Sequence, residues 1–156
     1  MKEAQAALEA MDAKNPILPD ETLIRNFQQH RSTFEELRQM IVADSGLHRV
    51  DDDWTDPADP ATVDVSPERI ADYRRLLTEV GCRRGFEHGS ATPGIYFISG
   101  AKGLAVAGQT KGYCYLETTP APIVTNTATY SSPQTYEEYE VYRPIESHWY
   151  IYLDSY

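Results

Sequence analysis

The chain is poor in the residues on which several functional classes depend. It holds two cysteines, four histidines, and 14 Lys and Arg against 24 Asp and Glu. The formal net charge of −10 opposes contact with a phosphate backbone, so nucleic acid is not the expected partner. No apolar run approaches the roughly 18 residues that a membrane-spanning helix needs. We therefore expect one soluble domain without a membrane span.

The scarcity of cysteine leaves the redox compartment open. Cys82 and Cys114 are compatible with a reduced pair in the cytoplasm and with a single disulfide in an oxidising compartment. Cys114 shares a strand face with Leu116, which slightly favours a buried free thiol. The polar N-terminal residues 1–14 lack the apolar centre of a signal peptide. If a signal peptide has been removed, the expected location is the periplasm or cell envelope, where a lipid anchor could hold the protein. Otherwise the expected location is the cytoplasm.

Recognisable metal, cofactor and catalytic motifs are also missing. Residues 51–64 hold six aspartates and no base, but a calcium loop counted from Asp51 would need glycine where Asp56 stands and an acid where Thr62 stands. No histidine has a zinc-ligand spacing from a cysteine, and residues 100–103 are too short for a phosphate loop. We expect no metal, no cofactor and no catalytic residue. An enzyme assembled from scattered groups such as His48 and Cys82 is the weaker alternative.

Helical patterns dominate the first half of the chain. Residues 2–13 are good helix formers, but so short a helix is marginal unless it packs. Asp20 can cap a helix over about 21–44, and a capping box at Ser32 allows that helix to restart there. Its apolar residues recur at spacings of three and four: Leu23, Ile24, Phe27, Phe34, Leu37 and Ile41. Ser66 and Gly81 bound a further helix over 67–80.

Strand patterns dominate the second half. Short aromatic or β-branched runs occupy residues 95–98, 104–107, 111–117, 136–143 and 148–153, with a weaker candidate at 47–50. Glycines at 100 and 103 predict a tight hairpin turn. Helices followed by strands predict a single α+β domain, in which the N-terminal helices pack on an antiparallel meander of about five C-terminal strands. In this prediction residues 1–80 are mainly helical, with an acidic loop at 51–64, and residues 81–156 form the sheet.

Tyrosine and acidic residues suggest where a partner could bind. Most of the eleven tyrosines follow residue 112, and several acids lie beside them. Tyrosine combines an apolar ring with a hydrogen-bonding tip, which suits protein interfaces. Packing of these rings within the core is the alternative. The predicted partner-binding residues are Tyr113, Tyr115, Glu137, Glu138, Glu140, Tyr150 and Tyr152.

Several runs of the chain resemble a group of small bacterial proteins without known activity. They are GIYFIS (94–99), KGYCY (111–115), YRPI (142–145) and HWYIY (148–152), together with FEELRQMI (34–41). Members of that group are often exported or lipoprotein-like. The resemblance therefore implies a shared fold and export, and it carries no catalytic residue to this chain.

These observations favour a non-enzymatic protein that binds another protein. An acidic, tyrosine-rich sheet surface suits a cationic partner, because opposite charge speeds encounter. We expect an immunity-type inhibitor of a basic bacterial toxin. The alternative is a structural or small-ligand-binding protein of the cell envelope.

Overall fold

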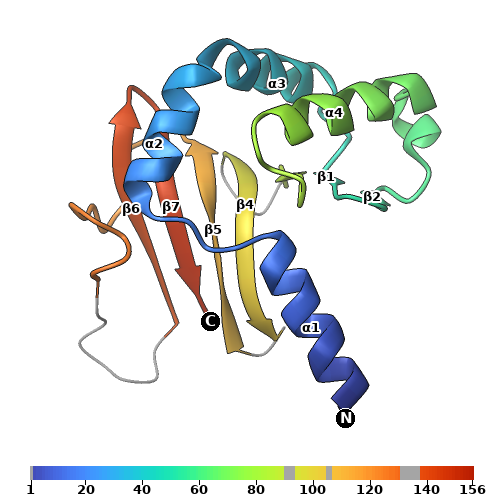
Figure 1. Ribbon diagram of the computed structural model, residues 1–156. Helices are drawn as coiled ribbons and strands as arrows, with labels where there is room; N and C mark the ends of the chain where they lie inside the picture. Colours follow the sequence, from blue (N-terminus) through green and yellow to red (C-terminus); the bar gives the residue numbers. More distant parts are fainter. Residues whose placement is uncertain (1, 90–93, 105–106, 131–137) are drawn as a thin grey trace.

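The computed structural model describes residues 2–89, 94–104, 107–130 and 138–156 (Figure 1). Within these residues it confirms the α+β class, with four α-helices and an antiparallel sheet. The sheet has seven strands, so the expected number of about five was too low. Each helix in the part of the chain that the structure describes is too short or too polar to span a membrane.

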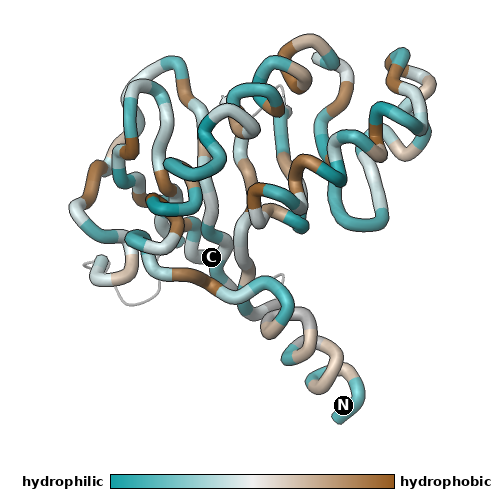
Figure 2. Tube along the Cα trace, turned by 45° about the horizontal axis from the view of Figure 1, so that its top comes forward, coloured by the Kyte–Doolittle hydropathy of each residue, from teal (hydrophilic) through white to brown (hydrophobic). Residues whose placement is uncertain are grey.

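The helices follow local signals in the sequence. They are α1 (Lys2–Lys14), α2 (Asp20–Gln29), α3 (Arg31–Ala43), α4 (Pro67–Glu79) and the short 3-10 helix η1 (Pro60–Val63). The predicted helix over 21–44 is divided at His30, close to the predicted restart. Ser66 caps α4 as predicted, since its hydroxyl accepts a hydrogen bond from the backbone N–H of Arg69 at 3.1 Å. α1 projects away from the body (Figures 1 and 2).

The strands extend the sheet beyond the predicted C-terminal set at one end only. They are β1 (Arg49–Val50), β2 (Thr55–Asp56), β3 (Phe86–Glu87), β4 (Ile95–Leu104), β5 (Ala107–Tyr115), β6 (Tyr139–Glu146) and β7 (Trp149–Ser155). Their order across the sheet is β2-β1-β3-β4-β5-β7-β6. The expected simple meander is therefore wrong at one end, because β7 lies between β5 and β6.

The predicted turn at residues 100–103 is also wrong. Gly100 and Gly103 lie inside β4, and the pairing of β4 with β5 continues to Leu104 and Ala107. The register shifts between Ile98 and Gly100, and Gly103 has a φ of +92°. Glycine serves here at an irregularity within two long strands, because it tolerates conformations that other residues avoid.

The main core lies between one face of the sheet and helices α2, α3 and α4 (Figure 1). Phe27 and Phe34 from the helices meet Tyr113 and Trp149 from the sheet, with ring centroids 4.7 to 6.0 Å apart. A second, smaller cluster of buried residues lies on the opposite face. Among the residues that the structure describes, it contains Cys114, Leu116, Tyr142, Tyr150 and Tyr152 but no helical residue. We call this side of the sheet the helix-free face.

Candidate functional site

Strand pairing brings tyrosines and acids together on the helix-free face. In the register, Tyr96 lies opposite Cys114 and Glu87, and Tyr142 lies opposite Tyr152. The hydroxyl oxygens of Tyr96 and Tyr142 are 3.4 Å apart. The rings of Tyr96 and Tyr152 pack edge to face, with centroids 5.0 Å apart. These rings, which come from β4, β7 and β6, form what we call the aromatic floor of this face.

Carboxylates border this aromatic floor. Glu140 and Asp154 lie directly opposite each other on β6 and β7. Burial raises the pKa of Glu140, and the charges of Asp154 and Glu87 add to the shift, while the hydroxyls of Tyr142 and Tyr96 oppose it. Burial and the charges of Glu138 and Glu87 raise the pKa of Asp154 in the same way. Like charges in direct opposition weaken a sheet, so this group is electrostatically strained.

The acidic group has little positive charge near it. Among the described residues, no Lys or Arg comes within 4.0 Å of the carboxylates of Glu140 or Asp154. Glu87 has a loose ion pair with Arg49, with 3.8 Å between Nη1 and Oε2. The face can therefore accept a cation without first breaking a strong pair.

The structure separates the predicted partner-binding residues. Glu138 is exposed and Glu140 is half-buried. Both lie at the helix-free face, to which Tyr150 and Tyr152 also belong. Both tyrosines are buried, so they form its floor and not its contact surface. Glu137 lies outside the described residues.

Tyr113 and Tyr115 are on the other face of the sheet, which corrects their expected place. Tyr113 is fully buried beneath the helices, where its hydroxyl donates to the carbonyl of Leu23 at 2.8 Å. Tyr115 packs against Trp149, and the Arg38 guanidinium lies 4.8 Å from its ring centroid. The register pairs Tyr113 with Ile151, so β5 directs these two rings toward the core.

Sequence reasoning missed Tyr96, Tyr142, Glu87 and Asp154 as members of the acidic aromatic surface. Alternation places Tyr142 on one side with Glu140, and Asp154 with Tyr152, and this signal was present in the sequence. Glu87 joins them only through β3, which has two residues and no periodicity of its own. Its membership required the three-dimensional pairing.

The acidic segment at residues 51–64 is held in place by arginines. Asp51 is buried, and its carboxylate pairs with Arg49 at 2.8 Å and with Arg84 at 3.5 Å. Arg74 Nε donates to the carbonyl of Asp51 at 3.1 Å. The remaining five aspartates of the segment are exposed: Asp52, Asp53, Asp56, Asp59 and Asp64. One aspartate thus anchors the segment, and the others give its surface a negative charge.

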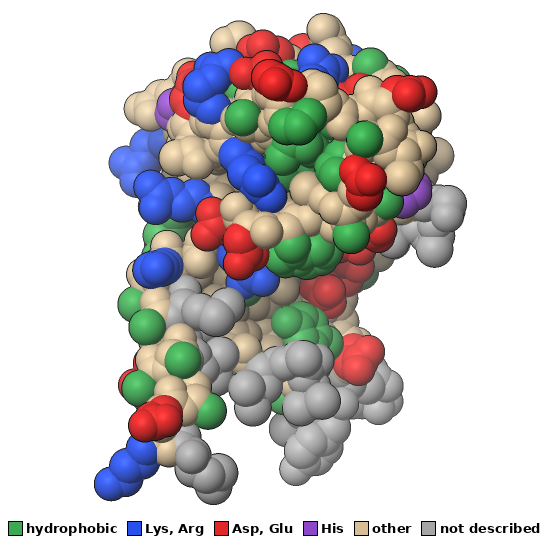
Figure 3. Space-filling view, turned by 90° about the vertical axis from the view of Figure 1, so that its right-hand side faces the viewer, with side chains coloured by type: hydrophobic (Ala, Val, Ile, Leu, Met, Phe, Trp, Pro, Cys, Tyr) green, Lys and Arg blue, Asp and Glu red, His purple; other side chains and the backbone are tan. Residues whose placement is uncertain are grey.

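A depression of about 460 Å³ lies between this segment and the start of α4. Trp54 forms part of its wall, and the indole is half exposed. Figure 3 looks onto this side of the molecule and shows hydrophobic side chains in its upper part, with acidic and basic side chains around them. The depression is a second place where a partner could dock.

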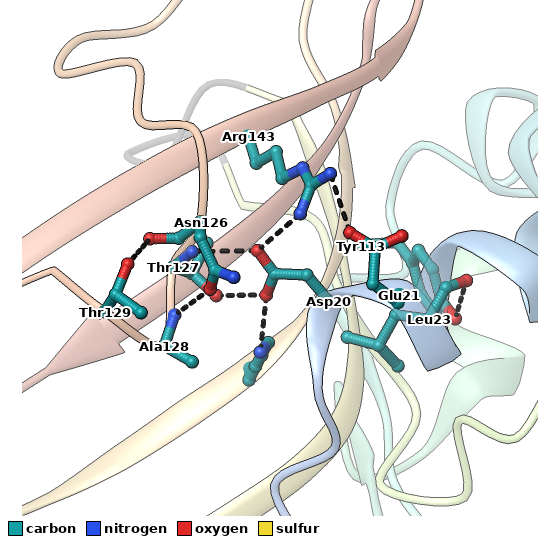
Figure 4. Close-up of polar contacts among 10 residues, drawn as sticks. Asp20, Glu21, Leu23, Tyr113, Asn126, Thr127, Ala128, Thr129 and Arg143 are labelled. Atoms are coloured by element: carbon teal, nitrogen blue, oxygen red, sulfur yellow. Dashed lines mark hydrogen bonds and ion pairs between the residues drawn. The ribbon is translucent and has the colours of Figure 1, made fainter.

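A buried ionic group links α2 to the sheet (Figure 4). Asp20 accepts from the Lys111 ammonium at 2.7 Å, from the backbone N–H of Thr127 at 2.8 Å and from the Thr127 hydroxyl. Arg143 Nη1 lies 3.3 Å from Asp20, and Arg143 Nη2 lies 2.9 Å from Glu21. Because Asp20 and Lys111 are buried and paired with each other, the centre of this group connects α2 to the sheet and is not a binding surface.

The cysteines and histidines considered for nucleophilic or metal chemistry are buried or are not grouped in space. Both cysteines are free and buried, and burial raises the pKa of each thiol, which keeps it protonated. His48 Nδ1 lies 2.8 Å from the carbonyl of His88. Within the described residues, no group of three or more His, Cys, Asp or Glu side chains is arranged to hold a metal ion.

Comparisons with protein-family models, with curated proteins and with solved structures gave no match to this chain. The resemblance noted in the sequence therefore stays a prediction.

Proposed function

We propose that this protein binds and inhibits a protein with a basic surface, as an immunity-type inhibitor of a bacterial toxin does. Contact would be made through the helix-free face of the sheet. The observation that carries the proposal is the pair of half-buried carboxylates, Glu140 and Asp154, which lie opposite each other and have no Lys or Arg nitrogen within 4.0 Å in the part of the chain that the structure describes.

The energetics of this pair favour a cationic partner. Two like charges in a partly buried site cost free energy in the unbound protein. A lysine or arginine from a partner would relieve that repulsion on binding, so part of the binding energy is already stored in the free protein. Strain retained at a surface is more common at functional sites than elsewhere.

The aromatic floor and the net charge support the same proposal. Tyr96 is half-buried on this face, and its hydroxyl is directed to that of Tyr142. A guanidinium or ammonium is attracted both to carboxylates and to the face of a tyrosine ring. The net charge of −10 would speed the encounter with a basic protein at low salt.

The test has a capture step and a kinetic step. The immobilised protein is exposed to native lysate at low and moderate salt, and the retained protein is identified and purified. Its association rate is then measured with wild type and with the double variant Glu138→Lys and Glu140→Lys. We expect the variant to associate at least about tenfold more slowly at low salt.

A matched control separates local from global charge. Glu36→Lys together with Glu68→Lys changes the net charge by the same amount at exposed positions on α3 and α4. The control should lose much less of the association rate. Wild type, but not the helix-free-face variant, should also restore growth to cells that express the captured protein. Equal rates for both variants, or a captured protein without toxicity, would contradict the proposal.

A further inference from the structure

The depression beside α4 has an apolar interior. Its lining includes the proline rings of Pro60 and Pro67 and the side chains of Ala61, Val65 and Ile70. Val65 and Ile70 are buried in the core below, so this floor is firm. Its volume of about 460 Å³ falls in the range of sites that take a small ligand or one large side chain.

Trp54 is a large aromatic side chain that remains exposed at this site. It stays 50% exposed, whereas the other tryptophan, Trp149, is 6% exposed. The Arg49 guanidinium lies 5.3 Å from the centroid of the Trp54 ring, which holds the indole from one side. An exposed, oriented tryptophan at the edge of an apolar depression is typical of a binding hot spot.

The charge around the depression is complementary to a cation. Asp53 and Asp59 belong to its lining, and Asp52, Asp56 and Asp64 are exposed in the same segment. Among the described residues, none of these five carboxylates is within 4.0 Å of a Lys, Arg or His nitrogen. The described lining includes one base, Arg74, whose Nε donates a hydrogen bond to the carbonyl of Asp51.

The walls are also ordered before any ligand arrives. Three arginines hold Asp51 at the turn between β1 and β2, and the backbone N–H of Asp51 donates to the carbonyl of Trp54 at 2.9 Å. Asp59 caps η1 by accepting from the backbone N–H of Ala61 at 3.2 Å. A preformed site loses little conformational entropy on binding.

We infer that this depression binds a basic peptide segment of another protein, which inserts one aliphatic or aromatic side chain between lysines or arginines. The apolar floor takes the inserted side chain, Trp54 covers it, and the aspartates pair with its cationic neighbours. This site is separate from the helix-free face, so the inference does not rest on the proposed function.

The test uses wild-type protein and two blocked pentapeptides. One has leucine at its centre and lysine at the other four positions, and the second has alanine in place of leucine. Collisional quenching by acrylamide acts on the exposed Trp54 and hardly on the buried Trp149. The leucine peptide should protect Trp54 from quenching, at a concentration at least about tenfold lower than the alanine peptide, because leucine buries more apolar surface.

Two variants locate the binding. Ala61→Phe fills the depression from an exposed position and should abolish the difference between the peptides. Glu138→Lys with Glu140→Lys should leave the titration unchanged, since these residues lie at the other end of the sheet. Thus the inference can fail while the proposed function stands, and the reverse also holds.

The inference is overturned by any of three results. Equal protection by both peptides would show attraction by charge alone. No protection at millimolar peptide would show that the depression is not a binding site. Binding of the leucine peptide that is unchanged in Ala61→Phe would place it elsewhere on the surface.

Discussion

Replacing Lys111 by methionine should destabilise the protein by about 3 kcal/mol. The Lys111 ammonium lies 2.7 Å from the Asp20 carboxylate, and each residue is 1% exposed. Removing one partner of a buried ion pair costs about 3 to 5 kcal/mol, because the other charge stays buried without compensation. Thr127 and Arg143 remain as partners of Asp20, which puts the expected loss at the lower end of that range.

Urea unfolding of a double-mutant cycle checks this value. The cycle uses Lys111→Met, Asp20→Asn and both changes together. Each single variant leaves a buried group uncompensated, whereas the double variant removes both charges. We expect the double variant to be less destabilised than the sum of the singles by at least about 1 kcal/mol. Additive losses, or a loss below about 1 kcal/mol for Lys111→Met, would refute the reasoning.

The pH dependence provides a second check of the same pair. Burial acts to raise the pKa of Asp20, but hydrogen bonds from Lys111 and Thr127 outweigh it, so the pKa is lowered. A lowered pKa stabilises the fold above the unfolded value of about 3.9, and this contribution is lost as the pH falls through the folded value. The difference between wild type and Asp20→Asn should therefore shrink in acid, and a difference independent of pH would contradict it.

Three further predictions concern other parts of the molecule. Glu140→Gln should raise the urea midpoint at pH 7, because the raised pKa of Glu140 means that its negative charge destabilises the folded protein. The gain should vanish below about pH 4, where Glu140 is protonated in both the folded and the unfolded protein. Gly85→Ala should lower the free energy of unfolding by at least about 2 kcal/mol in thermal or urea unfolding, because the φ of Gly85 is +83° and a Cβ would lie 1.5 Å from the carbonyl oxygen of Val50. Gly81→Ala should lower it by about 1 kcal/mol, because the φ of Gly81 is +76° but a Cβ there would lie in open space. Cys82 and Cys114 should react with a thiol reagent only on unfolding, and rapid reaction in the native state would contradict their burial.

Most of the helical half could be predicted because its signals are local. The buried stripe of α2 and α3 repeats every three or four residues, and Ser66 marks the beginning of α4. The division at His30 was expected only near Ser32, since no side-chain cap marks it. The sheet was harder because glycine indicates both turns and bulges, and Gly100 and Gly103 are at irregularities inside β4. Two-residue strands such as β3 have no periodicity to read.

The candidate surface could be predicted only in part. Alternation correctly places Trp149 and Tyr150 on opposite faces of β7. It does not show which face of β5 lies on the same side of the sheet as Trp149. That choice depends on the register between strands that are distant in sequence, which set Tyr113 beside Ile151 in the core. The depression beside Trp54 was not predicted, because it arises where the β1–β2 turn meets α4. Its acidic composition was visible in the sequence, and its apolar floor was not.

The place of β7 in the sheet affects the order in which the chain can fold. β7 follows every other described strand along the chain, yet it is hydrogen bonded to β5 on one side and to β6 on the other. On the ribosome, β6 emerges before the strand that joins it to the sheet. Until residues 149–155 emerge, β5 and β6 each have an unpaired edge that can associate with other chains. Nascent or truncated chains should therefore aggregate more readily than the finished domain, and a chaperone that shields strand edges would matter most during this interval.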